Sequence, residues 1–136
     1  LDVKLDFESV AAAGSMLGSG GVTVMEEGTD MVWAALRLME FFYHESCGKC
    51  SPCREGSSWL VQTMRRIMAK RGQMQDLETL TDLCKNIAGR TVCAFGDAEV
   101  SPIMSTLKHW RHEYETLIHE AEAANLIRPE SVGTRH

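Results

Sequence analysis

The chain has 136 residues, of which 44% are hydrophobic, and this length suits one compact domain rather than two full ones. Acidic residues outnumber basic ones by 19 to 14, and the formal net charge of -5 disfavours nucleic acid and anionic membrane surfaces as partners. No segment contains the roughly 18 apolar residues that a membrane-spanning helix needs, and residues 1–10 lack the features of a signal peptide. We therefore expect a soluble chain without direct membrane insertion.

The first segment, residues 1–28, shows signals of short strands. Apolar residues alternate near its start, residues 18–21 form a glycine-rich cluster, and residues 22–25 form a short apolar run. These patterns are typical of small strands joined by tight turns. The sequence therefore predicts a small β-containing segment ahead of the rest of the chain.

Helical periodicity begins after Gly28. Apolar residues recur at spacings of three and four between Met31 and Tyr43, which predicts an amphipathic helix. Asp30 is the expected N-cap, because its carboxylate can accept a hydrogen bond from the first turn. We expect this first helix to end near His44.

Two more helices follow closely. Ser51 as N-cap and Pro52 as the first helical residue predict a second helix that runs to about Arg71, where Gly72 supplies the stop. Residues 76–86 predict a third helix, because their apolar side chains again recur at helical spacing.

A long fourth helix is predicted from a second Ser-Pro pair, Ser101 and Pro102, with an apolar face that continues to Ala121. Four amphipathic helices with short connections form an antiparallel bundle, so the expected fold is mainly α. We assign residues 29–123 to this four-helix bundle and residues 124–136 to a C-terminal tail.

The cysteines carry the most specific signal. Three of the five lie two residues apart in a C-x2-C-x2-C motif, Cys47, Cys50 and Cys53, and Cys93 lies far downstream in an expected loop. An odd number with three crowded together indicates metal binding in a reducing compartment rather than disulfides. Three closely spaced thiolates can bind three corners of a cubane, and the packing of a bundle can bring a distant cysteine to the fourth iron. The sequence therefore predicts one 4Fe-4S cluster.

The residues around the motif suit an anionic cluster. Cys53 is expected in the first turn of the second helix, where free N–H groups and the positive end of the helix dipole face the sulfurs. Lys49 and Arg54 add positive charge, and Gly48 allows the backbone to turn tightly.

Other interpretations of the cysteines remain open. Structural zinc also takes four thiolates, although it usually draws them from two separated C-x2-C pairs. A thioredoxin-like redox pair would need a βαβ pattern, which is missing here. Cys84 falls at helical spacing with apolar residues and is expected in the core, and His44 is expected to be a neighbour of the motif rather than a ligand.

No motif for an autonomous enzyme is visible. The chain has no G-x-G-x-x-G or Walker A string, and no nucleophile with a recognisable base. Scattered Asp and Glu residues on the helices are expected on solvated faces. We therefore expect no catalytic residues and no phosphate or dinucleotide site in this chain.

Three strings resemble a known family. Residues 45–56, ESCGKCSPCREG, are similar to the cluster loop of the NADH-oxidising flavoprotein subunit of respiratory complex I. Residues 14–25, GSMLGSGGVTVM, and residues 91–97, TVCAFGD, also resemble that family, whose fourth cysteine lies in the latter string. The resemblance covers nearly the whole chain.

The resemblance implies a fold and a ligand set. Residues 1–28 would be the end of the family's small β-grasp-like module, and the remainder its C-terminal helical bundle. The four implied cluster ligands are Cys47, Cys50, Cys53 and Cys93.

The resemblance also implies a function. In that family, NADH reduces FMN in a larger N-terminal domain, and the 4Fe-4S cluster takes electrons singly from the flavin and passes them to further iron-sulfur centres towards quinone. This sequence has no counterpart of the flavin and NADH domain, so the chain is a fragment or a split subunit, and NADH dehydrogenase activity is not expected from it alone.

The implied partners are a flavin- and NADH-binding domain and neighbouring iron-sulfur subunits. The implied location is the peripheral arm of a membrane-bound complex, in the bacterial cytoplasm or the mitochondrial matrix. Diaphorase subunits of NAD-linked hydrogenases and formate dehydrogenases have similar cluster loops and are alternative members of the same family.

Overall fold

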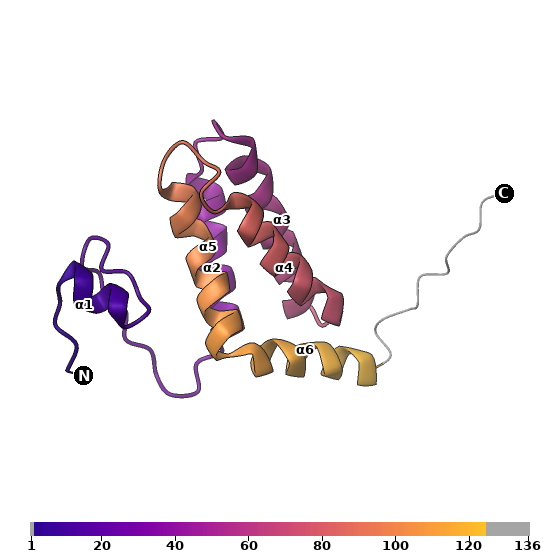
Figure 1. The fold of residues 1–136 in the computed structure, drawn as a ribbon. Coiled ribbons are helices and arrows are strands. Elements are labelled where there is room, and N and C mark those ends of the chain that lie inside the picture. The colour runs from indigo at the N-terminus through magenta and orange to yellow at the C-terminus, as the bar shows by residue number, and fades with distance from the viewer. Residues whose placement is uncertain (1, 125–136) are drawn as a thin grey trace.

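A computed structural model describes residues 2–124 of the chain. Within these residues the secondary structure is entirely helical, which confirms a mainly α fold (Figure 1). The helices in chain order are α1 (Phe7–Ala12), α2 (Met31–Glu45), α3 (Ser51–Met68), α4 (Met74–Ile87), α5 (Phe95–His109) and α6 (Arg111–Ala123).

Helices α2 to α5 form an antiparallel four-helix bundle. Successive helices alternate in direction, and each packs against the next, with α5 closing the ring against α2. The core lies along the middle of this ring and is built from fully buried aliphatic side chains such as Met39, Leu60, Leu80 and Ile103. Burial of such side chains stabilises the bundle by roughly 1.5–3 kcal/mol each.

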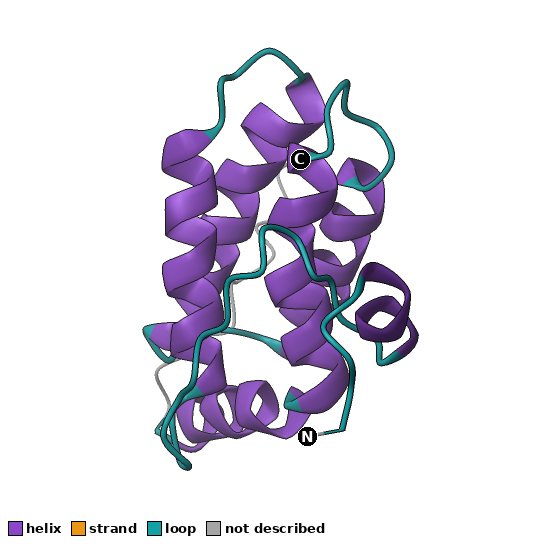
Figure 2. Ribbon diagram, turned by 90° about the vertical axis from the view of Figure 1, so that its left-hand side faces the viewer, coloured by secondary structure: helices purple, strands orange, loops and turns teal. Residues whose placement is uncertain are grey.

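The connections of the bundle fall into two groups. Because the helices alternate in direction, the α2–α3 connection and the α4–α5 connection lie at the same end, as both views show (Figure 1 and Figure 2). The first connection leads from Ser46 to Cys50, and the second contains Cys93. The topology therefore brings two cysteine-bearing loops to one end of the molecule.

The first and third predicted helices are confirmed. Asp30 is the N-cap of α2, where its Oδ1 accepts a hydrogen bond from Trp33 N at 2.8 Å. Helix α4 begins at Met74, two residues earlier than predicted, because the Asp76 carboxylate accepts a hydrogen bond from Gln73 N at 2.8 Å and so completes a capping box.

The second predicted helix differs from the observed helix α3 at both ends. Cys50 rather than Ser51 is the N-cap of α3, because proline is tolerated throughout the first turn and does not fix the cap at one position. The helix ends at Met68 rather than near Arg71. Lys70 adopts a left-handed φ of 55°, and Arg71 N donates to Arg66 O at 3.0 Å, which terminates the helix before Gly72.

The prediction of one long fourth helix is wrong in two respects. Helix α5 begins at Phe95, so Pro102 lies inside it and not at its start. The apolar face then continues in a separate helix, α6, because the backbone turns at Trp110, whose φ and ψ are -131° and 31°. The turn lets α6 cross the end of the bundle (Figure 1), where Tyr114 and Ile118 are fully buried. A straight helix would have carried these two side chains into solvent.

The strands predicted in residues 1–28 are not found. The described part of this segment, residues 2–28, contains the short helix α1 and irregular backbone. Asp6 caps α1 by accepting a hydrogen bond from Ser9 N at 2.7 Å, and none of the residues of α1 is buried. A strand needs a neighbour to pair with, and no neighbouring strand exists within residues 2–124. Nearly all of the predicted C-terminal tail, from residue 125 onward, lies outside the described residues.

Candidate iron-sulfur cluster site

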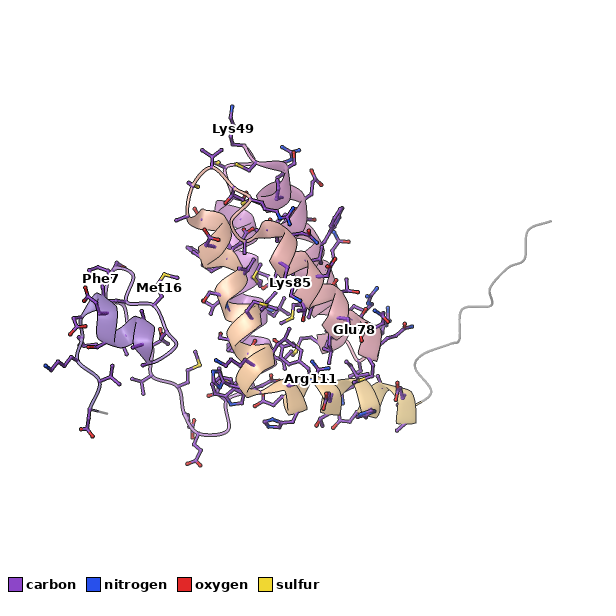
Figure 3. The ribbon with its side chains drawn as sticks, in the orientation of Figure 1. Phe7, Met16, Lys49, Glu78, Lys85 and Arg111 are labelled. Atoms are coloured by element: carbon purple, nitrogen blue, oxygen red, sulfur yellow. The ribbon has the colours of Figure 1, made fainter. Side chains whose placement is uncertain are left out.

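The four cysteines predicted as ligands line a single cavity at one end of the bundle. Its volume is about 200 Å³, and its lining consists of Cys47, Cys50, Cys53 and Cys93 together with Glu45, Lys49, Thr91, Phe95 and Gly96. Lys49 extends from the same end of the molecule (Figure 3). Across residues 2–124, no three cysteine, histidine or acidic side chains converge on one point where a single metal ion could be held.

The cysteines differ in exposure. Cys47 and Cys93 are exposed, Cys50 is half-buried, and Cys53 is 7% exposed. The cavity therefore has a closed side, where Cys53 meets the bundle core, and an open side formed by the two loops.

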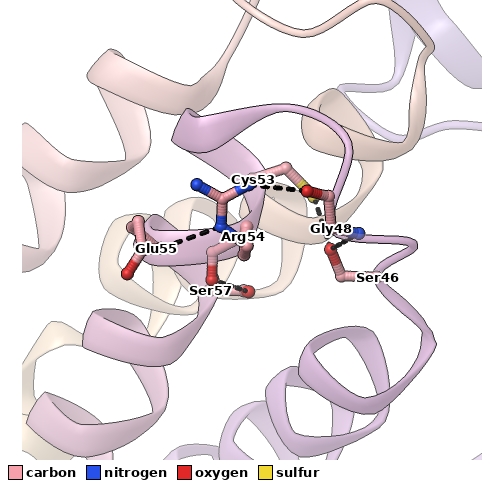
Figure 4. Close-up of polar contacts among 6 residues, drawn as sticks. All are labelled: Ser46, Gly48, Cys53, Arg54, Glu55 and Ser57. Atoms are coloured by element: carbon pink, nitrogen blue, oxygen red, sulfur yellow. Dashed lines mark hydrogen bonds and ion pairs between the residues drawn. The ribbon is translucent and has the colours of Figure 1, made fainter.

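The motif loop is folded around its own polar contacts (Figure 4). Gly48 has a left-handed φ of 74°, which favours glycine, and its carbonyl accepts a hydrogen bond from Arg54 Nη1 at 2.7 Å. Ser46 Oγ shares a hydrogen bond with Cys53 Sγ at 3.2 Å and accepts one from Gly48 N at 3.3 Å. Arg54 Nε also contacts Glu55 Oε1 at 2.8 Å, so Arg54 holds the curvature of the loop while its charge is paired.

The second loop is held against the first. Val92 N donates a hydrogen bond to Cys50 Sγ at 3.4 Å, which joins the loop carrying Cys93 directly to the motif. Gly89 N in the second loop donates to Asp97 Oδ1 in the first turn of α5 at 2.7 Å, and Thr91 Oγ1 donates to Cys93 O at 2.8 Å. Both loops are therefore positioned by hydrogen bonds of the protein itself.

Two helix N-termini face the site. Cys53 lies in the first turn of α3, as predicted, and Cys93 lies just before α5. Free N–H groups and the positive end of each helix dipole stabilise negative charge at these positions. Phe95 packs edge-to-face on Phe42, with ring centroids 5.5 Å apart, and forms an apolar wall beside the cavity.

Four thiol side chains around a cavity are a donor set that fits an iron-sulfur cubane. In a cubane each thiolate binds a different iron, so the sulfurs enclose a volume instead of meeting at one point. Burial raises the pKa of the Cys53 thiol, and the hydrogen bond from Ser46 opposes this shift. Iron binding therefore has to displace a proton from this residue.

One residue of the site region was missed by sequence reasoning. Glu99 is fully buried, and its Oε2 accepts a hydrogen bond from Cys53 Sγ at 3.4 Å. Burial raises the pKa of the Glu99 carboxyl to about 7. The expectation that acidic residues on helices lie on solvated faces is wrong for Glu99, which shares helical spacing with Phe95 and Ile103. This spacing indicates that Glu99 is buried. The predicted helix began at Ser101, so Glu99 lay outside it and the spacing was not considered.

The remaining candidates lie elsewhere. Cys84 is 1% exposed in the bundle core, as expected, and burial raises the pKa of its thiol to about 12. His44 is exposed and contacts Glu45 Oε1 through Nδ1 at 3.0 Å, outside the cavity lining. None of the helices within residues 2–124 is long and apolar enough to cross a membrane.

Comparison with known proteins agrees with the geometry of the site. A model of the family described as the NADH-ubiquinone oxidoreductase-F iron-sulfur binding region matches residues 33–117. An NADH-quinone oxidoreductase subunit of Streptomyces coelicolor is 56% identical over 115 residues, and one of Rhizobium meliloti is 53% identical over 120 residues.

These relatives are much longer than the chain. The alignments cover 85% and 88% of the chain but only 26% and 28% of the two relatives. A crystal structure of an NAD+-reducing [NiFe]-hydrogenase in the H2-reduced state is similar in fold, with a TM-score of 0.69 and 28% identity, and the match covers 82% of this chain and 18% of that one. The chain thus belongs to the family of the NADH-ubiquinone oxidoreductase-F iron-sulfur binding region, as its cysteine motif and flanking strings predicted.

Proposed function

We propose that Cys47, Cys50, Cys53 and Cys93 ligate one 4Fe-4S cluster. The observation that carries this proposal is that all four side chains line the same cavity, although Cys93 comes from a different loop. A cavity of about 200 Å³ between the thiols also favours a cluster over a single zinc ion, which four thiolates would surround closely.

When bound, such a cluster supplies one-electron transfer at a potential set by its protein surroundings. The residues of the chain hold and shield it. The N-termini of α3 and α5 stabilise negative charge, and Val92 N–H donates to the sulfur of Cys50. Arg54 holds the motif loop through its hydrogen bond to Gly48 O. Phe95, which packs on Phe42, forms an apolar wall on one side of the cavity.

An iron-sulfur electron relay in an NADH dehydrogenase-like complex is the function that the family match and the relatives' names support. We propose that the relay accepts electrons from FMN, reduced by NADH in another domain or chain, and passes them to further iron-sulfur subunits towards quinone. The chain spans about a quarter of the length of its relatives, which leaves room for flavin and NADH sites outside it. We place it in the peripheral arm of such a complex, in a bacterial cytoplasm or a mitochondrial matrix.

A second candidate keeps the same relay in an NAD-linked hydrogenase. The fold similarity to the NAD+-reducing hydrogenase supports it, but the identity there is 28%, against 56% for the quinone oxidoreductase relative. The quinone-linked complex is therefore the preferred setting.

Electron transfer from reduced flavin tests the relay. The chain is loaded anaerobically with iron and sulfide and mixed with FMNH2, and the absorbance of the cluster and of the flavin is followed. The expected result is uptake of one electron per chain. Cys93→Ala is the control, in which no four-iron cluster should form and so none should be reduced. A loaded cluster that stays oxidised over excess FMNH2 would contradict the relay, and a chain that binds one zinc ion and no iron would support a structural role instead.

A further inference from the structure

Glu99 is a buried acidic residue that forms no salt bridge with any of the described residues. Its side chain is fully buried, and among the described residues its Oε1 is the only buried side-chain nitrogen or oxygen that lacks a hydrogen bond. Asp76, also buried, is by contrast paired with Arg66 through a hydrogen bond of 3.1 Å from Nε. A buried carboxyl that lacks a cation destabilises the fold, so its presence in α5 calls for an explanation.

Within residues 2–124, the one hydrogen-bond partner of the Glu99 side chain is a proposed cluster ligand. Glu99 Oε2 lies 3.4 Å from Cys53 Sγ, a contact that joins α5 to the first turn of α3. Glu99 is not among the residues that line the cavity. It therefore contacts the sulfur of Cys53 from outside the cluster site and is not positioned as a ligand itself.

The chemistry of this contact changes when Cys53 binds iron. A thiol can donate a hydrogen bond to the carboxyl, but an iron-bound thiolate has no proton and only accepts. An ionised carboxylate also only accepts, so the two groups would repel each other at this distance between two buried side chains. The contact is favourable only if the carboxyl carries a proton and donates a hydrogen bond through it to the sulfur.

We propose that Glu99 is a positioning residue that donates a hydrogen bond from its neutral carboxyl to Cys53 Sγ of the bound cluster and so raises the cluster's reduction potential. This inference rests on the proposed function. A donor that faces a ligand sulfur stabilises the more negative, reduced state more than the oxidised one, so the reduction equilibrium shifts towards the reduced cluster.

Redox titration of the loaded protein tests the proposal. Glu99→Gln keeps a neutral donor of the same shape, whereas Glu99→Met and Glu99→Leu remove it; two apolar variants are made so that the test survives if one fails to fold. Each is loaded with iron and sulfide, and its potential is measured by EPR. We expect the apolar variants to shift the reduction equilibrium at least tenfold towards the oxidised cluster, which lowers the potential of a one-electron couple by about 59 mV. The reduction equilibrium of the Gln variant should stay within threefold of that of the wild type.

Two results would overturn the proposal. One is a Gln variant whose reduction equilibrium shifts tenfold or more towards the reduced cluster, a rise of about 59 mV, which would mean that Glu99 is ionised. The other is a pair of apolar variants with an unchanged potential. Thr106→Val is the matched control, because it removes a buried polar group from the same helix, where Thr106 Oγ1 and Tyr114 OH lie 2.8 Å apart. It should lower stability and leave the potential unchanged. Wild-type protein that takes up no iron would count against the proposed function itself, independently of Glu99.

Discussion

Cys50 and Cys93 show how a local motif and a distant residue form one site. The C-x2-C-x2-C spacing alone gives three neighbouring thiols. The fourth, that of Cys93, lies beside them because the second loop is held against the first, and Val92 N donates a hydrogen bond to Cys50 Sγ between the two loops. The four candidate ligands could be predicted from the sequence, since their type and spacing are specific. The helical spacing of Glu99 with Phe95 and Ile103 signals its burial, but its contact with Cys53 could not be predicted, because that contact joins two helices.

The ligand set is tested by single substitutions. Replacing any of the four cavity cysteines by Ala should abolish the intact cluster, because each thiolate binds a different iron. Cys84→Ala should keep the full cluster and lower the free energy of unfolding by about 1–2 kcal/mol, as expected for a small cavity in the core. Iron counting after anaerobic loading distinguishes the two outcomes. Equal loss of iron in the Cys84 variant would refute the assignment.

Cys84 also makes a prediction about reactivity. Burial raises the pKa of its thiol to about 12, so its thiolate form is scarce at pH 8, and the core excludes the reagent. Iodoacetamide at pH 8 should therefore modify the exposed Cys47 and Cys93 of the folded, cluster-free chain well before Cys84, as read by peptide mass spectrometry. In 6 M guanidinium, a condition of roughly complete unfolding, Cys84 should react like the others. Rapid labelling of Cys84 in the folded chain would contradict its placement in the core.

At the scale of elements, the close approach of α5 to the preceding loop depends on Gly96. A Cβ at this position would lie 2.6 Å from Thr91 Cγ2 and would also clash with Thr91 Oγ1. We expect Gly96→Ala to push this loop outward, to destabilise the fold by roughly 1–3 kcal/mol and to reduce cluster occupancy. Iron content and thermal unfolding measure both effects.

The matched control is the double variant Gly96→Ala with Thr91→Ala, which removes the two shortest contacts. It should recover most of the lost iron relative to Gly96→Ala alone, with Thr91→Ala as its own reference. If Gly96→Ala binds the cluster like wild type, the packing of this loop does not position Cys93.

The turn at Trp110 is held by a buried hydrogen bond between α5 and α6. Thr106 Oγ1 and Tyr114 OH lie 2.8 Å apart, and Tyr114 is fully buried. Tyr114→Phe should lower the free energy of unfolding by about 1 kcal/mol, because Thr106 still donates to Pro102 O and is not left unpaired. Denaturant titration measures the change, and Tyr43→Phe, at an exposed position, is the control. No change for Tyr114 would mean that this bond does not stabilise the turn.

Sequence patterns located the helices of the bundle but not all of their ends. Asp30 could be predicted as a cap because its contact is local. The turn at Trp110 could not, because it follows from where the bundle ends and not from a local stop signal. Strands were expected in residues 1–28 from apolar alternation and turn signals, and strand formation depends on partners that such local patterns do not reveal.

For the whole molecule, the bundle core and the cluster site make separate contributions to stability. The core is built from aliphatic side chains of α2 to α6, so the cluster-free chain should keep its helical far-UV circular dichroism. Cluster binding links the two loops and should raise the unfolding temperature, since a group that binds only the folded state stabilises it. Comparing thermal unfolding with and without the cluster measures this, and equal unfolding temperatures would contradict a cluster that spans both loops.

The most direct test of the account is the iron and inorganic sulfide content of the chain after anaerobic loading, combined with EPR of the reduced sample. We predict about four irons and four sulfides per chain, with a fast-relaxing signal that is visible only at low temperature. One tightly bound zinc ion with no uptake of iron would contradict the cluster and, with it, the electron relay.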